Sequence, residues 1–155
     1  MPAGADSVLD DVTVQGGLTV EPGARVIVRD AEIRGSIVAT QPAYVLVDDA
    51  TVRGSLPATD APSLGSSGFN EVTIFSTEIR GDVVLTDNHS SLVQLSLAVV
   101  RGSVTFSGNT ETVNNINANT IDVNLDCIGN TLAPTGDPNT VGGTAPGQCA
   151  GLVAP

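Results

Sequence analysis

The sequence predicts an all-β protein, a single-stranded parallel β-helix (β-solenoid) with three faces, and a recurring five-residue motif is the first observation behind this prediction. Each copy holds an aliphatic residue, arginine, glycine, a small polar residue and a second aliphatic residue. The copies occupy residues 33–37, 52–56, 79–83 and 100–104, and a weaker copy occupies 14–18. A repeat of this period is typical of a solenoid, in which no coil can bury its apolar face alone.

Three alternating segments in each coil are the second observation. With the motif glycine as position zero, apolar residues recur two and four residues before it, two and four after it, and seven and nine before it. The last of these columns holds Val26 and Val28, Val45 and Val47, Val72 and Ile74, and Val93 and Leu95. Alternation with β-branched residues predicts short strands, and the Gly, Ser, Asn and Asp between them predict turns. Right-handed crossovers are expected.

The glycine spacing divides the chain into segments. The glycines at 16, 35, 54, 81 and 102 are 19, 19, 27 and 21 residues apart, and the pattern continues to 123 and 143, giving roughly seven coils. We expect a polar lead-in at 1–7, a solenoid at 8–129 and a terminal coil and tail at 130–155. The longest interval predicts a Pro-, Ser- and Gly-rich loop at 57–68, which either carries function or is a tolerated insertion. The alternative fold, an antiparallel sandwich, would not repeat its inward columns at a near-fixed interval.

Composition excludes several functional classes. The 155 residues carry a net charge of −11, and all six basic residues are arginine, which argues against binding to nucleic acid or to anionic membranes. No run of about 20 apolar residues is present, so no membrane insertion is expected. Three Phe, one Tyr and no Trp leave few aromatic rings for stacking on sugars or bases.

The only cysteines, Cys127 and Cys149, are expected to form a disulfide that ties down the Gly- and Pro-rich tail. Such a bond would stabilise the fold by about 3 kcal/mol through loop closure. It favours an oxidising compartment, and therefore an extracellular or cell-surface location. The alternative is a pair of buried free thiols. No signal-peptide pattern is seen, and Met1 is interpreted as a start placed before a mature chain.

Two outward features are candidate interaction surfaces. The first is a column formed by the motif arginines, one residue before zero: Arg34, Arg53, Arg80 and Arg101. Glu32 and Glu78 lie on the same face as these arginines. This column is either a solvated ion-pair ladder or an anion-binding strip for a glycan or a protein. The second feature is an apolar outward position held by Ile27 and Leu46 in adjacent coils, which the lead-in, the 57–68 loop or another molecule should cover.

Catalysis, metal binding and ice binding find little support in the sequence. The outward carboxylates Asp82, Asp87, Asp122 and Asp126 do not form one column, as a polysaccharide-active enzyme would require, and His89 lies in a turn. No cofactor is expected, and no calcium loop or zinc ligand set is present. Ice-binding β-solenoids present regular rows of threonine. Here the outward columns three residues before and three residues after zero contain Glu, Val and Pro among the threonines, so neither column is a regular row.

The repeated columns and the tail resemble a group of secreted bacterial (actinobacterial-type) β-solenoid proteins that end in a two-cysteine segment. The similarity rests on residues 125–130, 134–136, 139–143 and 147–150. It implies an exported protein without established catalytic residues. A looser resemblance links residues 78–84 to bactofilins, the polymer-forming β-helices, although the two-cysteine tail and the inserted loop depart from them.

These observations together predict a non-enzymatic, exported β-solenoid that acts as a structural, self-assembling or surface interaction module. The first coil begins early, without a cap helix, so self-association through its strand edges is expected unless Asp6, Asp10 and Asp11 repel partners. The alternative is a carbohydrate-binding module that uses the arginine column or the 57–68 loop. Ice binding and a polysaccharide-active enzyme are remote alternatives.

Overall fold

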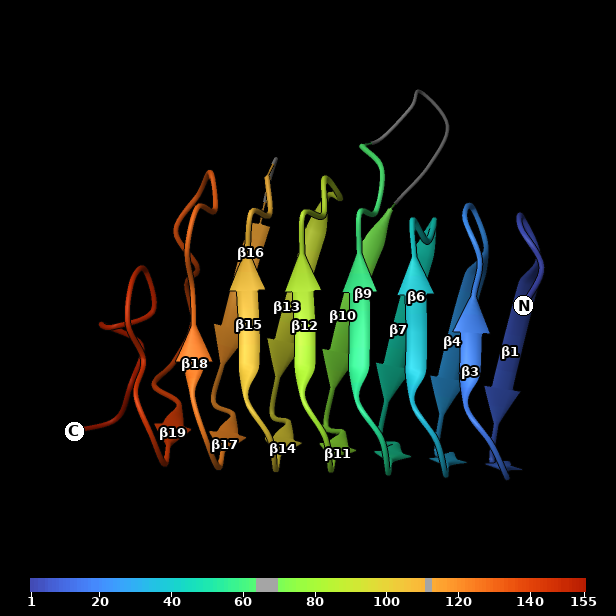
Figure 1. Cartoon of the computed structure of the whole chain (residues 1–155), viewed down its shortest axis with the longest axis horizontal. Coiled ribbons are helices and arrows are strands. Elements are labelled where there is room, and N and C mark those ends of the chain that lie inside the picture. The colour runs from blue at the N-terminus through green and yellow to red at the C-terminus, as the bar shows by residue number, and fades with distance from the viewer. Residues whose placement is uncertain (64–69, 111–112) are drawn as a thin grey trace.

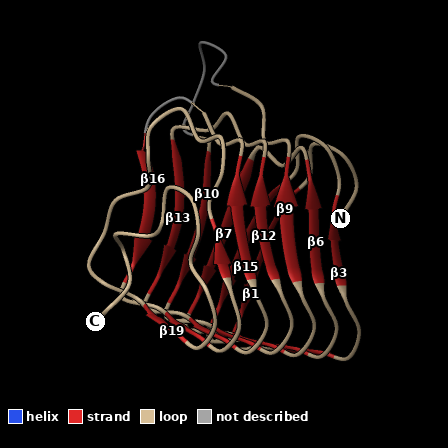
Figure 2. Ribbon diagram, turned by 60° about the vertical axis from the view of Figure 1, so that its left-hand side comes forward, coloured by secondary structure: helices blue, strands red, loops and turns tan. Residues whose placement is uncertain are grey.

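The computed structural model describes residues 1–63, 70–110 and 113–155, and its strands form a rod of three parallel sheets with no helix (Figure 1). The order of strands within each sheet shows that successive coils stack directly on one another (Figure 2). Sheet A contains β1 (Asp6–Asp10), β4 (Arg25–Arg29), β7 (Tyr44–Asp48), β10 (Glu71–Phe75), β13 (Leu92–Ser96) and β16 (Val113–Asn117). Sheet B contains β2 (Thr13–Val14), β5 (Glu32–Ile33), β8 (Thr51–Val52), β11 (Glu78–Ile79), β14 (Val99–Val100), β17 (Thr120–Ile121) and β19 (Thr140–Val141). Sheet C contains β3 (Leu18–Val20), β6 (Ile37–Thr40), β9 (Leu56–Thr59), β12 (Val83–Thr86), β15 (Val104–Ser107) and β18 (Leu125–Asp126). The predicted parallel β-helix is confirmed.

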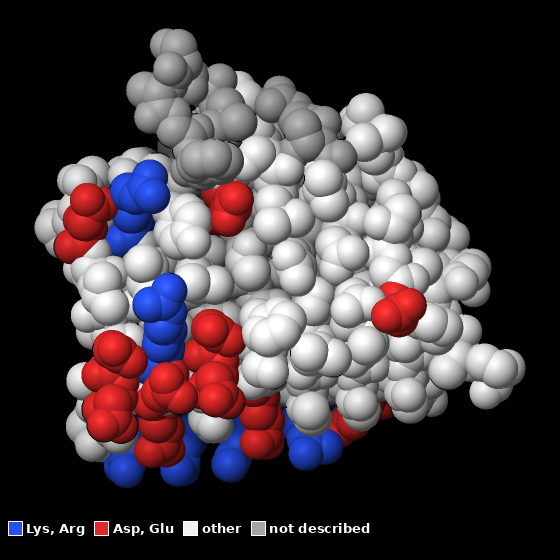
Figure 3. Space-filling view, turned by 180° about the vertical axis from the view of Figure 1, so that it is seen from behind, with Lys and Arg blue, Asp and Glu red and all other residues white. Residues whose placement is uncertain are grey.

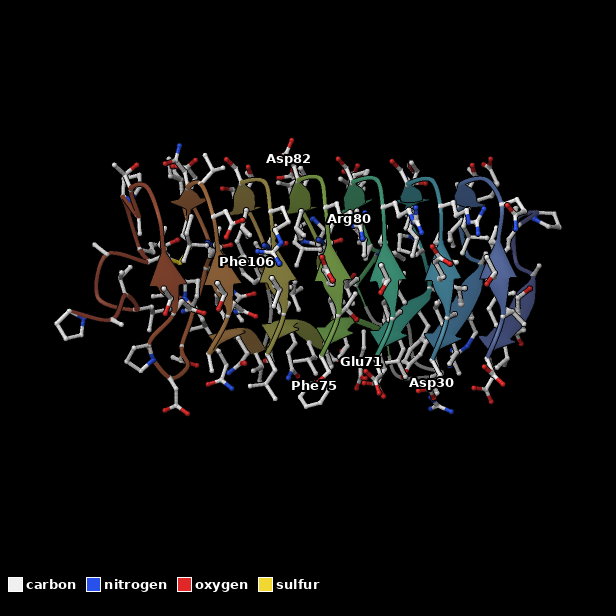
Figure 4. All side chains as sticks on the ribbon, turned by 90° about the horizontal axis from the view of Figure 1, so that it is seen from below. Asp30, Glu71, Phe75, Arg80, Asp82 and Phe106 are labelled. Atoms are coloured by element: carbon white, nitrogen blue, oxygen red, sulfur yellow. A yellow bond between two sulfur atoms is a disulfide. The ribbon has the colours of Figure 1, made fainter. Side chains whose placement is uncertain are left out.

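The core is the aliphatic interior of the rod. The inward columns predicted from the alternation are buried from the second coil to the sixth, and most of their side chains are fully inaccessible. Phe106 is the largest buried side chain and points into the rod, whereas Phe75 lies on the outer surface (Figure 4). Because inward and outward residues alternate along each strand, burial alone fixes the register of every coil.

The motif glycines stack on one another at one corner of the rod. The amide of Gly54 donates to the carbonyl of Gly35 at 3.0 Å, and the amide of Gly81 donates to that of Gly54 at 3.0 Å. A Cβ atom added at Gly54 would lie 2.7 Å from the Ser36 nitrogen and 2.8 Å from the Gly35 carbonyl carbon. A Cβ atom does not fit this close approach at Gly54 unless the two coils shift, whereas the sixth coil accommodates Val123 at the equivalent position.

Buried amide side chains form ladders that the sequence did not reveal. Asn88, Asn109 and Asn130 occupy equivalent positions in three successive coils, and all three are at most 6% exposed. The Asn109 Oδ1 accepts hydrogen bonds from the Asn88 backbone nitrogen at 3.1 Å and from its Nδ2 at 3.0 Å, while Asn130 does the same for Asn109. Gln148 continues the ladder beyond Asn130. Each amide thus satisfies backbone groups that the turn would otherwise bury unpaired.

Segment boundaries differ from the sequence prediction at two places. Strand β1 begins at Asp6, so the lead-in is shorter than 1–7. Residues 57–59 belong to strand β9, so the insertion begins after Thr59, and the part of the predicted loop at 64–68 lies outside the described residues. The alternation that places Leu56 and Ala58 in inward columns already predicts a strand as far as Ala58, so the predicted strand and the predicted loop overlap at 57–58. Pro57 has no backbone N–H to donate, and the pairing of β9 with β6 is accordingly limited to Ala58 and Thr59, while Pro57 keeps its register with Val84 of β12.

Candidate functional site

The arginine column lies on the outer face of sheet B, as predicted, and we call it the arginine strip (Arg34, Arg53, Arg80 and Arg101). Its side chains are 45–51% exposed. Arg53 donates from Nε to the Glu32 Oε1 at 2.6 Å, which bridges two coils. Arg101 lies 3.7 Å from Glu78 in the preceding coil and 3.4 Å from Asp122 in the next.

The arginine strip holds more guanidinium groups than the carboxylates that pair with them. Four guanidinium groups share three carboxylates, those of Glu32, Glu78 and Asp122. Arg80 approaches an acid only at 3.9 Å, within its own coil, because its neighbouring coils carry Thr51 and Val99 at the position of Glu78. The predicted ladder is therefore present, with pairs worth at most about 1 kcal/mol each at this exposure. Anion binding by the strip stays a prediction.

A column of acids lies at the corner between sheets A and B in the first three coils. Asp11, Asp30 and Asp49 have φ values of 50°, 47° and 47°, a left-handed conformation that Asp tolerates better than most residues. They line an open groove together with Glu32. Desolvation and the charges of neighbouring acids, Asp49 first, raise the pKa of the Asp30 carboxyl.

The described residues contain no group of three or more His, Cys, Asp and Glu side chains arranged to hold a metal ion. Carboxylates considered for catalysis also lie apart. Asp122 pairs with Arg101, and the Asp82 Oδ1 accepts from the Ser103 nitrogen at 2.8 Å at the glycine corner. His89 Nδ1 contacts the Thr110 hydroxyl, away from both.

The apolar outward position on sheet A extends further than the sequence indicated. Ile27 and Leu46 are half-buried, and Val8 continues the column at 61% exposure, in register with Ile27. We call these three residues the apolar stripe. Side chains of the same sheet flank the apolar stripe on one side: Arg25 lies 5.0 Å from the centre of the Tyr44 ring and 3.8 Å from Asp6. A groove remains between these side chains, with Ile27 in its floor.

The first coil is the least covered part of the core. Its inward residues Leu9, Val14 and Leu18 are only partly buried, and Val12 is 39% exposed, whereas their counterparts in the second coil are 0–5% exposed. Strands β1, β2 and β3 each pair on one side only. Met1 covers part of this end by packing on the core and donating to the Thr19 carbonyl.

The opposite end is closed by the tail. Cys127 and Cys149 form the predicted disulfide, with a Cα–Cα distance of 5.5 Å, and both are fully buried. The tail then folds back on Asn139, whose backbone nitrogen donates to the Leu152 carbonyl at 2.7 Å and whose carbonyl accepts from Ala154 at 2.8 Å. The two ends of the rod therefore differ in how well the core is covered.

One outward column escaped the sequence interpretation. Four hydroxyl side chains follow each other at the fifth position after the motif glycine, on the outer face of sheet C: Thr40, Thr59, Thr86 and Ser107. Counting columns out to this position would have found it. The column beside it holds Val38, Pro57 and Val84, so hydroxyl and aliphatic rows lie side by side.

No helix among the described residues has the length and apolarity needed to cross a bilayer. No family model matches the chain, and no curated protein or solved structure is similar enough to count as a match. The class defined by the structure is thus a disulfide-closed parallel β-solenoid, and the functional argument depends on its surfaces.

Proposed function

We propose that the protein is a non-enzymatic structural module, exported to the cell surface or beyond, that self-associates through the open N-terminal end of its solenoid. The observation that carries this proposal is the difference in burial between equivalent residues: Val12 is 39% exposed, while Ala31, one coil further on, is 5% exposed. Unpaired strand edges over an open apolar core are a template for further strand pairing.

A second copy of the chain supplies the partner that this end lacks. The C-terminal end is less available because the disulfide-tied tail crosses it. Asp10 and Asp11 flank the open end, so two such ends repel each other at low ionic strength. Added salt screens this repulsion and should strengthen the association, since the apolar contribution is not weakened by screening.

Sedimentation velocity at rising protein concentration tests the proposal. Val12→Lys places an ammonium group in the apolar opening, where contact with a second copy would desolvate it, and should leave a monomer at concentrations where the parent chain associates. Val38→Lys is the matched control, because Val38 is also 39% exposed but lies on the outer face of sheet C. A parent chain that stays monomeric throughout, or two variants that behave alike, would rule out the end contact.

The buried disulfide and the thin aliphatic core support an oxidising location. Fractionation of the native host, with probing of the intact surface by antibody, tests export. Recovery of the reduced protein in the cytosol would contradict it.

Glycan binding is the second candidate, and the incomplete neutralisation of the arginine strip favours it. Four half-exposed guanidinium groups in a row suit a polyanionic saccharide. Arg53→Ala and Arg80→Ala together should abolish retention on anionic glycan columns. Unchanged retention, or none in the parent chain, removes this candidate.

A further inference from the structure

The outer face of sheet A carries a charge pattern that is complementary to itself. The apolar stripe of Val8, Ile27 and Leu46 runs along the rod, crossing β1, β4 and β7. On one side of it, the register places Asp6, Arg25 and Tyr44 in a row, and on the other side Asp10, Arg29 and Asp48. Figure 3 shows charged side chains gathered on the N-terminal half of this face, while the rest of the face is nearly free of charge.

Arg29 distinguishes this face from the arginine strip. The other five arginines each form an ion pair within the chain. Arg29 is the one arginine without an ion pair in the part of the chain that the structure describes, and its residue is exposed. An unpaired guanidinium beside an apolar stripe fits an anionic partner group placed opposite it.

We infer that a second copy of the chain docks on the apolar stripe, face to face and with its rod axis antiparallel, about a two-fold axis between β4 and β7. This axis sets Ile27 of each copy against Leu46 of the other. It also sets Arg29 of each copy against Asp48 of the other, and Arg25 against Tyr44. The contact is isologous, so each favourable pair occurs twice.

The parallel alternative is excluded by charge. Two copies related by a two-fold axis along the rod bring Asp6 of one copy onto Asp10 of the other, and Arg25 onto Arg29. Like charges placed directly opposite each other oppose association. In the antiparallel arrangement the only like-charge pair joins Asp6 to Glu71, at the rim of the contact where solvent screens it.

The lateral contact between two rods is small, and its area limits its strength. Four overlapping strands about 4.8 Å apart, each with five residues at about 3.3 Å, give a footprint of roughly 300 Å² per copy. A standard interface buries about 800 Å² per partner. The lateral contact is therefore weak between single rods, and it becomes effective where another contact already holds several copies together. It is distinct from the proposed end contact and does not depend on it.

The test uses chains that carry Val12→Lys, so that the end contact is already blocked. Sedimentation velocity up to about 1 mM should show a concentration-dependent dimer in this background, within the Kd range of weak contacts. Arg29→Asp and Asp48→Arg, each alone, should weaken this dimer at least about tenfold, because both place like charges opposite each other. Arg80→Asp makes the same charge change as Arg29→Asp but lies on sheet B, and should have no effect.

A mixture of the two single variants is the decisive sample. When Arg29→Asp chains meet Asp48→Arg chains, every 29–48 contact between copies again joins opposite charges. The heterodimer should therefore recover to within about threefold of the Val12→Lys parent. Recovered dimerisation in the mixture cannot come from a change inside either chain, because residues 29 and 48 still carry like charges within each variant. A monomeric parent, equal dimerisation by the single variants, or a mixture that stays monomeric each overturns the inference. The end contact is tested separately, by comparing the parent chain with Val12→Lys, so failure of one contact is distinguished from failure of the other.

Discussion

The stacked motif glycines make the most specific prediction about stability, and Gly54→Ala tests it. The new Cβ atom would lie 2.7 Å from the Ser36 nitrogen and 2.8 Å from the Gly35 carbonyl carbon, and both are backbone atoms that cannot move without separating two coils. Overpacking of this kind costs about 1–3 kcal/mol. The smaller conformational freedom of alanine in the unfolded chain returns about 0.4–1 kcal/mol. The expected net loss of stability is therefore about 1–2 kcal/mol.

Gly16→Ala provides the matched control, because no heavy atom lies within 4 Å of a Cβ atom built at Gly16. We expect this variant to unfold within about 0.5 kcal/mol of the parent chain, or to be slightly more stable. Thermal unfolding followed by far-ultraviolet circular dichroism measures both, and a loss of about 1–2 kcal/mol corresponds to a fall in Tm of roughly 2–8 °C. A Gly54→Ala chain as stable as its parent, or an equal loss in both variants, would refute the stacking argument.

Three further predictions concern the tail, the amide ladder and the acidic corner. Replacing Cys127 and Cys149 with serine opens a loop of 22 residues and should cost about 3 kcal/mol, read from urea unfolding; an unchanged midpoint would contradict this. Asn109→Ala leaves the backbone nitrogen of Asn88 buried without its acceptor and should cost about 2 kcal/mol in the same urea unfolding; an unchanged midpoint would contradict this. Asp30→Asn should raise Tm at pH 7 but not at pH 3. The pKa of Asp30 is raised above 3.8 in the folded state, so its ionised carboxylate destabilises the fold above the folded-state pKa and has no such effect below 3.8. A rise in Tm at both pH values would contradict an electrostatic origin of the effect.

The coil register could be predicted from the sequence because two independent constraints point to the same alignment. Inward aliphatic columns repeat with the glycine, and a shift by one residue would expose every one of them. The arginine strip and its acids were found for the same reason, since their distance from the glycine fixes the face on which they lie. The cysteine pair was found because it is the only one in the chain.

The asparagine ladders and the pairing of Arg25 with Tyr44 were not predicted. Asparagine is common in turns, so its recurrence at Asn88, Asn109 and Asn130 resembled ordinary turn composition. Burial distinguishes a ladder from a solvated turn, and burial depends on how the corner of one coil lies on the next. Similarly, Arg25 and Tyr44 are far apart in the sequence and become neighbours only through the register of β4 and β7.

The open first coil is the centre of the functional account, and amide hydrogen exchange measured at several protein concentrations tests it most directly. If copies associate through this end, exchange of amides in β1, β2 and β3 should slow as concentration rises, while amides of β12 and β15 in the middle of the rod should not change. Val12→Lys should remove the concentration dependence. Exchange in the first coil that is independent of concentration, in samples that nevertheless associate, would contradict the end contact.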